Sequence, residues 1–252
     1  MTDDPQPSEG YKTLHIDQDG PVLTARLHTG RTDAVLDVAA IDDLLKLLDS
    51  LTERTDVKVL VLSSTAEDFC LGADRTEFAA AREADPTGAA LRRIVDKGYR
   101  LCQALETTDT ITIARLSGRV TGAGLALVSY FDLRVGADTS RYRMPEGVLG
   151  LPPAWGGATG RLITEVGLSR IRELMLTCRE FDAATAHRID LLHETVPEAD
   201  LDRAVSAWTR SLSRRSHESM IATKRMLTGY ARADRTVDLG PLDANLLTAH
   251  LA

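Results

Sequence analysis

The stretch Ser117-Gly118-Arg119-Val120-Thr121-Gly122-Ala123-Gly124 follows an apolar, strand-like run over residues 110–116. A second stretch, Phe69-Cys70-Leu71-Gly72-Ala73-Asp74, follows a similar run over residues 57–62. Glycine adds no side-chain clash where a backbone N–H must turn toward a bound atom. Two such turns that converge on one point form an oxyanion hole, which stabilises negative charge on an acyl oxygen. The pair of turns therefore indicates acyl chemistry, which neither turn would indicate alone.

Apolar periodicity predicts strands and helices in alternation, followed by helices alone. Strands are expected at residues 14–16, 22–27, 57–62 and 110–116, and helices at residues 38–51, after Asp37 as a cap, and at about 88–106. Beyond residue 168 the pattern becomes helical, with Ser169 and Asp182 as candidate caps. This order predicts an α/β core over residues 11–168 and a helical region over residues 169–252. Residues 1–10 are polar and contain proline, and we expect them to be disordered.

The composition excludes several classes of function. A hydrophobic fraction of 43% with 27% charged residues over 252 residues is typical of a globular protein with one substantial core. The net charge of −7 argues against nucleic acid as a main partner. Three cysteines without paired spacing predict reduced thiols and a cytoplasmic protein, and the six histidines show no metal-ligand spacing. No secretory signal and no apolar stretch of roughly 18–20 residues is present, so we expect no membrane partner.

Three further segments lie in the same order as in a known family. They are Phe131-Asp132-Leu133-Arg134-Val135-Gly136-Ala137-Asp138, Met144-Pro145-Glu146 and Gly150-Leu151-Pro152-Pro153-Ala154-Trp155-Gly156-Gly157. With the two glycine turns, they resemble the enoyl-CoA hydratase/isomerase (crotonase) superfamily over about residues 22–227. The resemblance implies a ββα spiral core whose C-terminal helices pack in a homotrimer or a dimer of trimers. It implies a thioester of coenzyme A or of an acyl carrier protein as the partner, with coenzyme A as part of the substrate and no separate cofactor.

The resemblance also assigns roles to individual residues. Leu71 and Ala123 match the positions of the two oxyanion N–H donors. The substrate-binding positions would be Gly72, Ala73, Asp74, Gly122, Gly124, Ala126, Trp155, Arg31 and Lys224. Asp74 also reads as a helix cap, and Trp155 reads equally as a core residue. Arg31 and Lys224 match regions that contact coenzyme A phosphates, although each reads by default as a solvated cation.

One departure from the family pattern favours a particular reaction. Hydratases of the family carry one glutamate where this chain has Ala126 and a second in the Pro-Glu segment, and the pair holds the water that is added. This chain keeps only Glu146, whose pKa we expect the neighbouring Val148 and Leu149 to raise. One carboxylate suffices to move a proton between two carbons, which favours isomerisation of an enoyl thioester through an enolate. The alternatives are hydration or dehydration, decarboxylation or C–C bond formation, and non-catalytic binding of acyl-CoA.

Overall fold

The computed structural model describes residues 7–28, 34–235 and 237–251. Within these residues a six-stranded sheet has the order β1-β2-β3-β4-β6-β9. Its strands are β1 (Leu14–Asp19), β2 (Val22–Leu27), β3 (Val59–Ser64), β4 (Ile111–Leu116), β6 (Leu133–Ala137) and β9 (Glu194–Val196). The first two strands form an antiparallel hairpin, and every later neighbour pairs in parallel. The four strands predicted for the core are therefore confirmed, β2 with the predicted bounds and the other three with shifts of up to three residues at their ends.

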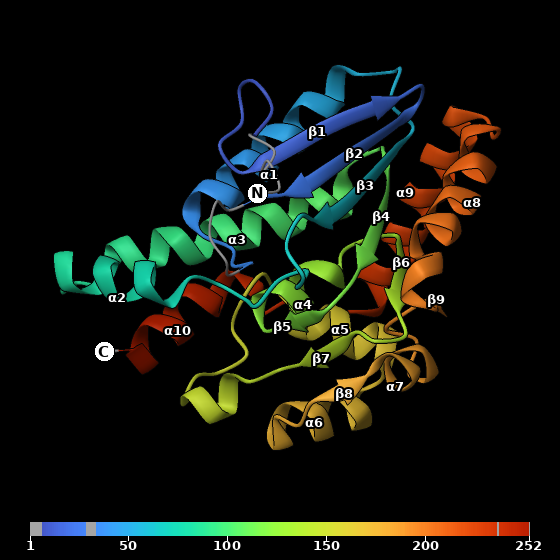
Figure 1. Cartoon of the computed structure of the whole chain (residues 1–252). Coiled ribbons are helices and arrows are strands. Elements are labelled where there is room, and N and C mark those ends of the chain that lie inside the picture. The colour runs from blue at the N-terminus through green and yellow to red at the C-terminus, as the bar shows by residue number, and fades with distance from the viewer. Residues whose placement is uncertain (1–6, 29–33, 236, 252) are drawn as a thin grey trace, which may run out of the picture.

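Helices cover both faces of this sheet (Figure 1). On one side α1 (Val38–Ser50), capped by Asp37 as predicted, packs against α3 (Ala89–Thr107), and α8 (Leu201–Ser213) packs on the other. In β3, Val59 and Val61 join the cluster under α8, while Leu60 and Leu62 join the larger core with α1. This alternation follows from the two-residue repeat of a strand, and a strand buried on both faces is expected in a parallel sheet.

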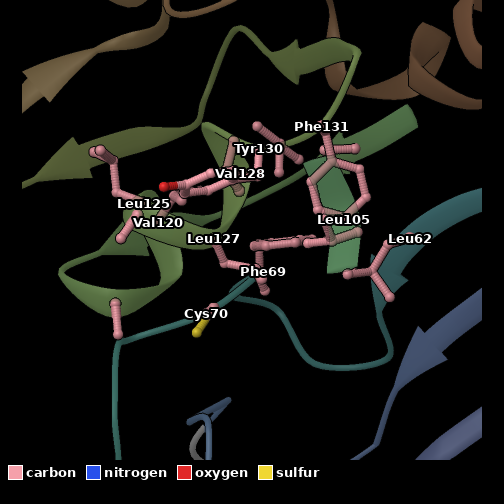
Figure 2. Close-up of a cluster of buried hydrophobic side chains, with 14 of the residues drawn as sticks. Leu62, Phe69, Cys70, Leu105, Val120, Leu125, Leu127, Val128, Tyr130 and Phe131 are labelled. Atoms are coloured by element: carbon pink, nitrogen blue, oxygen red, sulfur yellow. The ribbon is translucent and has the colours of Figure 1, made fainter. Parts of the chain in front are cut away.

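A smaller sheet carries the second glycine turn. In the described part of the chain it contains β5 (Arg119–Thr121), β7 (Arg141–Arg143) and β8 (Phe181–Asp182), in the order β5-β7-β8. The short helix α4 (Ala123–Val128) begins directly after β5. Buried side chains of α4, of both turns and of their surroundings pack together, among them Phe69, Cys70, Val120, Leu125 and Leu127 (Figure 2). This packing brings together two segments that are distant in the sequence.

Gly124 makes that approach possible. A Cβ at this position would lie 2.6 Å from the Cβ and 2.7 Å from the Sγ of Cys70, closer than real side chains come. Any larger residue would therefore push α4 away from the first turn. A glycine is needed at this position because α4 lies so close to Cys70, and not because the backbone adopts a left-handed conformation.

The remaining helices are α2 (Arg75–Ala84), α5 (Ala158–Val166), α6 (Leu168–Thr177), α7 (Ala183–Arg188), α9 (His217–Asp234) and α10 (Asp243–Leu251). Short 3-10 helices are η1 (Leu51–Glu53), η2 (Glu146–Leu149), η3 (Glu198–Asp200) and η4 (Gly240–Leu242). Among the described helices, none is both long and apolar enough to cross a bilayer.

Three predictions need correction. The region from residue 169 is not purely helical, because β8 and β9 lie in it and β9 pairs with β6 of the main sheet. Asp182 caps α7 as predicted, but Ser169 lies inside α6, whose N-cap is Gly167. Within the predicted disordered tail, residues 1–6 lie outside the described residues, whereas the backbone N–H of Ser8 donates to Leu14 and its hydroxyl accepts from Ile16 N at 2.8 Å. Hydrogen bonds to β1 therefore order the end of that tail.

Candidate active site

The first glycine turn lies between two partner segments. On one side, Cys70 accepts from Thr121 N at 2.9 Å and donates to the carbonyl of Arg119 at the β5 edge. On the other, the carbonyl of Gly72 accepts from Leu36 N at 2.8 Å. The described peptide bonds are all trans, so the N–H that follows each carbonyl points in the opposite direction. Hydrogen bonds from outside the turn therefore fix where each of its N–H groups points.

These orientations contradict the role predicted for Leu71. The carbonyl of Cys70 points toward β5, so the Leu71 N–H points away from β5 and donates to the carbonyl of Ala34 at 2.6 Å. The carbonyl of Gly72 points toward Leu36, so the Ala73 N–H points back toward the side of β5 and α4. Ala73, predicted only as a binding residue, thus presents the free N–H of this turn.

The second turn presents a matching N–H. Ala123 is the first residue of α4, and a first-turn N–H has no acceptor within its own helix. Within the described residues, neither its N–H nor that of Ala73 has a protein acceptor. A Cβ on Gly72 would lie 3.7 Å from Ala123 N, which shows how closely the two turns approach. Two unpaired donors at this junction are the arrangement that an acyl oxygen requires.

Glu146 lies beside these donors. It begins η2, directly after Pro145, and its Oε1 would be 3.3 Å from a Cβ on Gly122, the residue before Ala123. Burial raises the pKa of the Glu146 carboxyl above the ordinary glutamate value. Val148 and Leu149, which were expected to cause this shift, are 67% and 38% exposed and do not line the cavity at Glu146.

The apolar surroundings of Glu146 come instead from a small cavity. Its volume is about 20 Å³, and its walls include Gly122, Leu125, Ala126, Met144, Pro153, Trp155, Ala158, Thr159, Leu162 and Met175. Among the described residues that line it, only Glu146 has an ionisable side chain. Ala126 therefore contributes a methyl group to the cavity wall, at the position where hydratases of the resembling family carry their other glutamate.

Two other predicted binding residues serve the fold. Asp74 caps α2, and its carboxylate accepts from Thr76 N at 2.8 Å. Lys224, assigned to coenzyme A phosphates, is 6% exposed, and its ammonium donates to Asp132 at 2.7 Å and to the carbonyl of Thr110 at 2.9 Å. Neither the phosphate contact nor the solvated cation fits this geometry, which corrects both predictions for Lys224. Arg31 lies outside the described residues.

Sequence reasoning missed part of the site. Met175 and Leu162 reach the cavity from α6 and α5, and no local signal marks them. Gly98 could have been found from the sequence, because a glycine within a helical pattern usually marks a place where another group packs closely against the helix. A Cβ there would lie 2.6 Å from Cε2 of Trp155, so Gly98 lets the indole lie against α3. Trp155 is 8% exposed and lines the cavity as well, so the two predicted roles are compatible.

Comparison with known proteins places the chain in a family. The model of the enoyl-CoA hydratase/isomerase family matches residues 19–250. The chain belongs to this family. A probable enoyl-CoA hydratase of Mycobacterium bovis is 29% identical over 206 residues, which cover 82% of this chain and 77% of that protein. A probable enoyl-CoA hydratase of Mycobacterium avium is 31% identical over 183 residues, covering 72% and 68% of the two chains.

The fold agrees with membership of the enoyl-CoA hydratase/isomerase family. The crystal structure of an enoyl-CoA hydratase from Bacillus halodurans matches with a TM-score of 0.86 over 94% of each chain, at 20% identity. At that identity the match shows the fold alone. The predicted superfamily and its α/β fold with a helical C-terminal region are confirmed.

Proposed function

We propose that this protein isomerises the double bond of an enoyl thioester of coenzyme A or of an acyl carrier protein. The thioester oxygen would accept hydrogen bonds from the N–H groups of Ala73 and Ala123. These two bonds acidify the neighbouring carbon, because they stabilise the negative charge that appears on the oxygen when a proton leaves. Glu146 takes the proton from C2 and returns it to C4, so the double bond moves from C3–C4 to C2–C3. The enzyme ends each turnover with its carboxylate ionised again.

The observation that carries this proposal is the solitary carboxylate. Among the described residues around the cavity, Glu146 is the sole acid–base group, and Ala126 lines the same cavity without one. A single base suffices to remove a proton and to return the same proton elsewhere. The raised pKa of Glu146 also suits this role, because a carboxylate in apolar surroundings binds a proton more strongly.

Hydration is the second candidate, and the names of the relatives favour it. Two relatives carry the description of probable enoyl-CoA hydratase. A cavity of about 20 Å³ is large enough for a water molecule, which Glu146 alone would then have to orient and deprotonate. Addition of water needs both a base for the nucleophile and an acid for the carbon, and Ala126 supplies neither. Decarboxylation, C–C bond formation and non-catalytic binding remain more distant alternatives.

The deciding experiment compares two substrates under identical conditions. Purified protein is incubated with a 3-enoyl-CoA and, separately, with crotonyl-CoA, and the products are separated by liquid chromatography with mass detection. We expect conversion of the 3-enoyl to the 2-enoyl thioester at unchanged mass, and little gain of water on crotonyl-CoA. Faster hydration than isomerisation would establish the second candidate. Binding without turnover of either thioester would leave the acyl-CoA-binding alternative.

The C-terminal helices support a second part of the proposal, a homotrimer or a dimer of trimers. On α9, Met226, Leu227 and Tyr230 are 63%, 64% and 73% exposed. Apolar side chains gathered on one helix are typical of surfaces that pack against another subunit. Light scattering coupled to size-exclusion chromatography tests this, and a monomer at micromolar concentration would refute it. We also propose a cytoplasmic location, because Cys70, Cys102 and Cys178 are buried free thiols.

A further inference from the structure

The acyl end of the site is nearly closed. The cavity beside Glu146 has a volume of about 20 Å³, which is room for about one water molecule and therefore for about one methyl group. It adjoins Gly122, and Gly122 precedes the donor Ala123. A thioester oxygen held by the two donors would place its acyl carbons past Glu146 and toward this cavity. The volume beyond Glu146 then limits how long the acyl group can be.

Trp155 is the bulkiest of the described residues that line the cavity. Its indole lies against α3, where the absence of a side chain at Gly98 allows contact with the helix backbone. Buried tryptophans usually find an acceptor for their N–H group. Within the described residues, however, the Nε1 atom of Trp155 has no hydrogen-bond partner. The contribution of Trp155 to the cavity wall therefore comes from the size of its ring and not from a hydrogen bond of Nε1.

The loop that carries Trp155 is held by two hydrogen bonds at the residues directly after it. The hydroxyl of Tyr130 donates to the carbonyl of Gly156 at 2.9 Å. The carboxylate of Asp243, at the start of α10, accepts from the N–H of Gly157 at 2.8 Å. Because its ring lies against α3 and the residues after it are held by these two hydrogen bonds, Trp155 has little room to move aside. A longer acyl chain would have to displace the packed ring of Trp155. This displacement is costly because protein interiors are close-packed and leave little free volume.

We infer that Trp155 is a specificity-determining residue that restricts the substrate to short acyl groups, such as the butanoyl chain. This inference rests on the proposed function, since it places an acyl thioester between Ala73, Ala123 and Glu146. Trp155 itself takes no part in proton transfer. Gly98 shares the role, because it fixes how deeply the indole can recede from the cavity.

The test measures binding, so that it does not depend on which reaction the enzyme performs. Saturated butanoyl-, hexanoyl- and decanoyl-CoA cannot isomerise or add water, and calorimetry gives their affinities for the intact protein. One methylene that does not fit a closed pocket changes discrimination by about 10- to 200-fold. We therefore expect the unmodified protein to bind butanoyl-CoA at least about tenfold more tightly than decanoyl-CoA. Trp155→Ala should reverse that order, while Trp155→Phe, which keeps an aromatic ring but lacks Nε1, should preserve it.

The outcomes separate this inference from the proposed function. Failure of the unmodified protein to bind any of the three thioesters would overturn this inference and the part of the proposed function that concerns coenzyme A thioesters, and would leave carrier-protein thioesters as the substrate. Binding of decanoyl-CoA as tightly as butanoyl-CoA by the unmodified protein would overturn the role of Trp155 alone. Circular dichroism shows whether Trp155→Ala folds. If it does not, the unmodified protein and Trp155→Phe decide the question. The phenyl ring is smaller than indole and should reduce the preference without reversing it, so a preference as strong in the phenylalanine variant as in the unmodified protein would contradict a role based on bulk.

Discussion

Replacement of Glu146 by glutamine removes one proton-accepting site and changes little else. Glutamine has the same length as glutamate and keeps one carbonyl oxygen, but its amide cannot accept a proton from carbon. The residue starts η2 beside Gly122, so the replacement leaves both oxyanion donors in place. The variant therefore isolates the proton-transfer step from thioester binding.

The expected loss is large because no second base lies among the described residues that line the cavity. A general base contributes about 10² to 10⁴ in rate. At 1.36 kcal/mol for each factor of ten, this is about 2.7 to 5.4 kcal/mol of activation free energy. Among the described residues of the cavity, no other side chain can take the proton, so we expect the upper half of this range. The loss should appear in kcat with KM nearly unchanged.

Stability should change in the opposite direction. Burial raises the pKa of Glu146, so the folded protein binds more protons than the unfolded chain between the two pKa values. The free energy of unfolding therefore falls as pH rises through that window, and the loss persists at neutral pH. Glutamine removes this penalty, so the Tm of Glu146→Gln at neutral pH should equal or exceed that of the unmodified protein. For the same reason, kcat of the unmodified enzyme should fall on acidification with a midpoint above about 4.3, the ordinary glutamate pKa.

The assay follows isomerisation of a 3-enoyl-CoA by steady-state kinetics over a series of pH values, with Tm from calorimetry. Glu53→Gln, at an exposed glutamate of η1, is the matched control and should retain full activity. A general base contributes at least about 100-fold in rate, so a loss of less than about tenfold in kcat for Glu146→Gln would refute the assignment of the base. A drop of the same size in affinity for saturated thioesters would show that the variant disturbs binding instead.

Three further substitutions test other contacts. Ala126→Glu should supply the missing second carboxylate and raise hydration of crotonyl-CoA, measured as loss of the conjugated thioester; no gain would show that the cavity lacks room for an oriented water. Asp243→Asn should flatten the dependence of Tm on pH between about 3.9 and about 6, because burial raises the pKa of Asp243 to about 6 and the unmodified protein loses stability as this carboxyl ionises. Lys224→Met should cost about 3 kcal/mol in denaturant unfolding, since it leaves the carboxylate of Asp132 without its ammonium partner. Its folded fraction should bind coenzyme A as before, and a selective loss of that affinity would restore the predicted phosphate contact.

Local chemistry determined the elements and part of the site. Asp37 and Asp182 cap helices because a side-chain oxygen can satisfy an N–H two or three residues away, and such a signal needs no tertiary contact. The alternation of Val59, Leu60 and Val61 likewise follows from the strand repeat alone. Glu146 remains a prediction that the sequence alone produced, from a motif and the absence of a second carboxylate.

Only the tertiary structure decided which atoms of those motifs face the cavity. Whether Leu71 or Ala73 presents its N–H depends on the carbonyl directions that Leu36 and Thr121 impose, and both partners are remote from the turn in sequence. A peptide plane can point either way along an extended segment, so its own residues do not settle the direction. The burial of Lys224 likewise depends on a partner that is remote in sequence. Lysines are mostly exposed, and this one can be buried because the carboxylate of Asp132 offsets the cost of removing its ammonium from water.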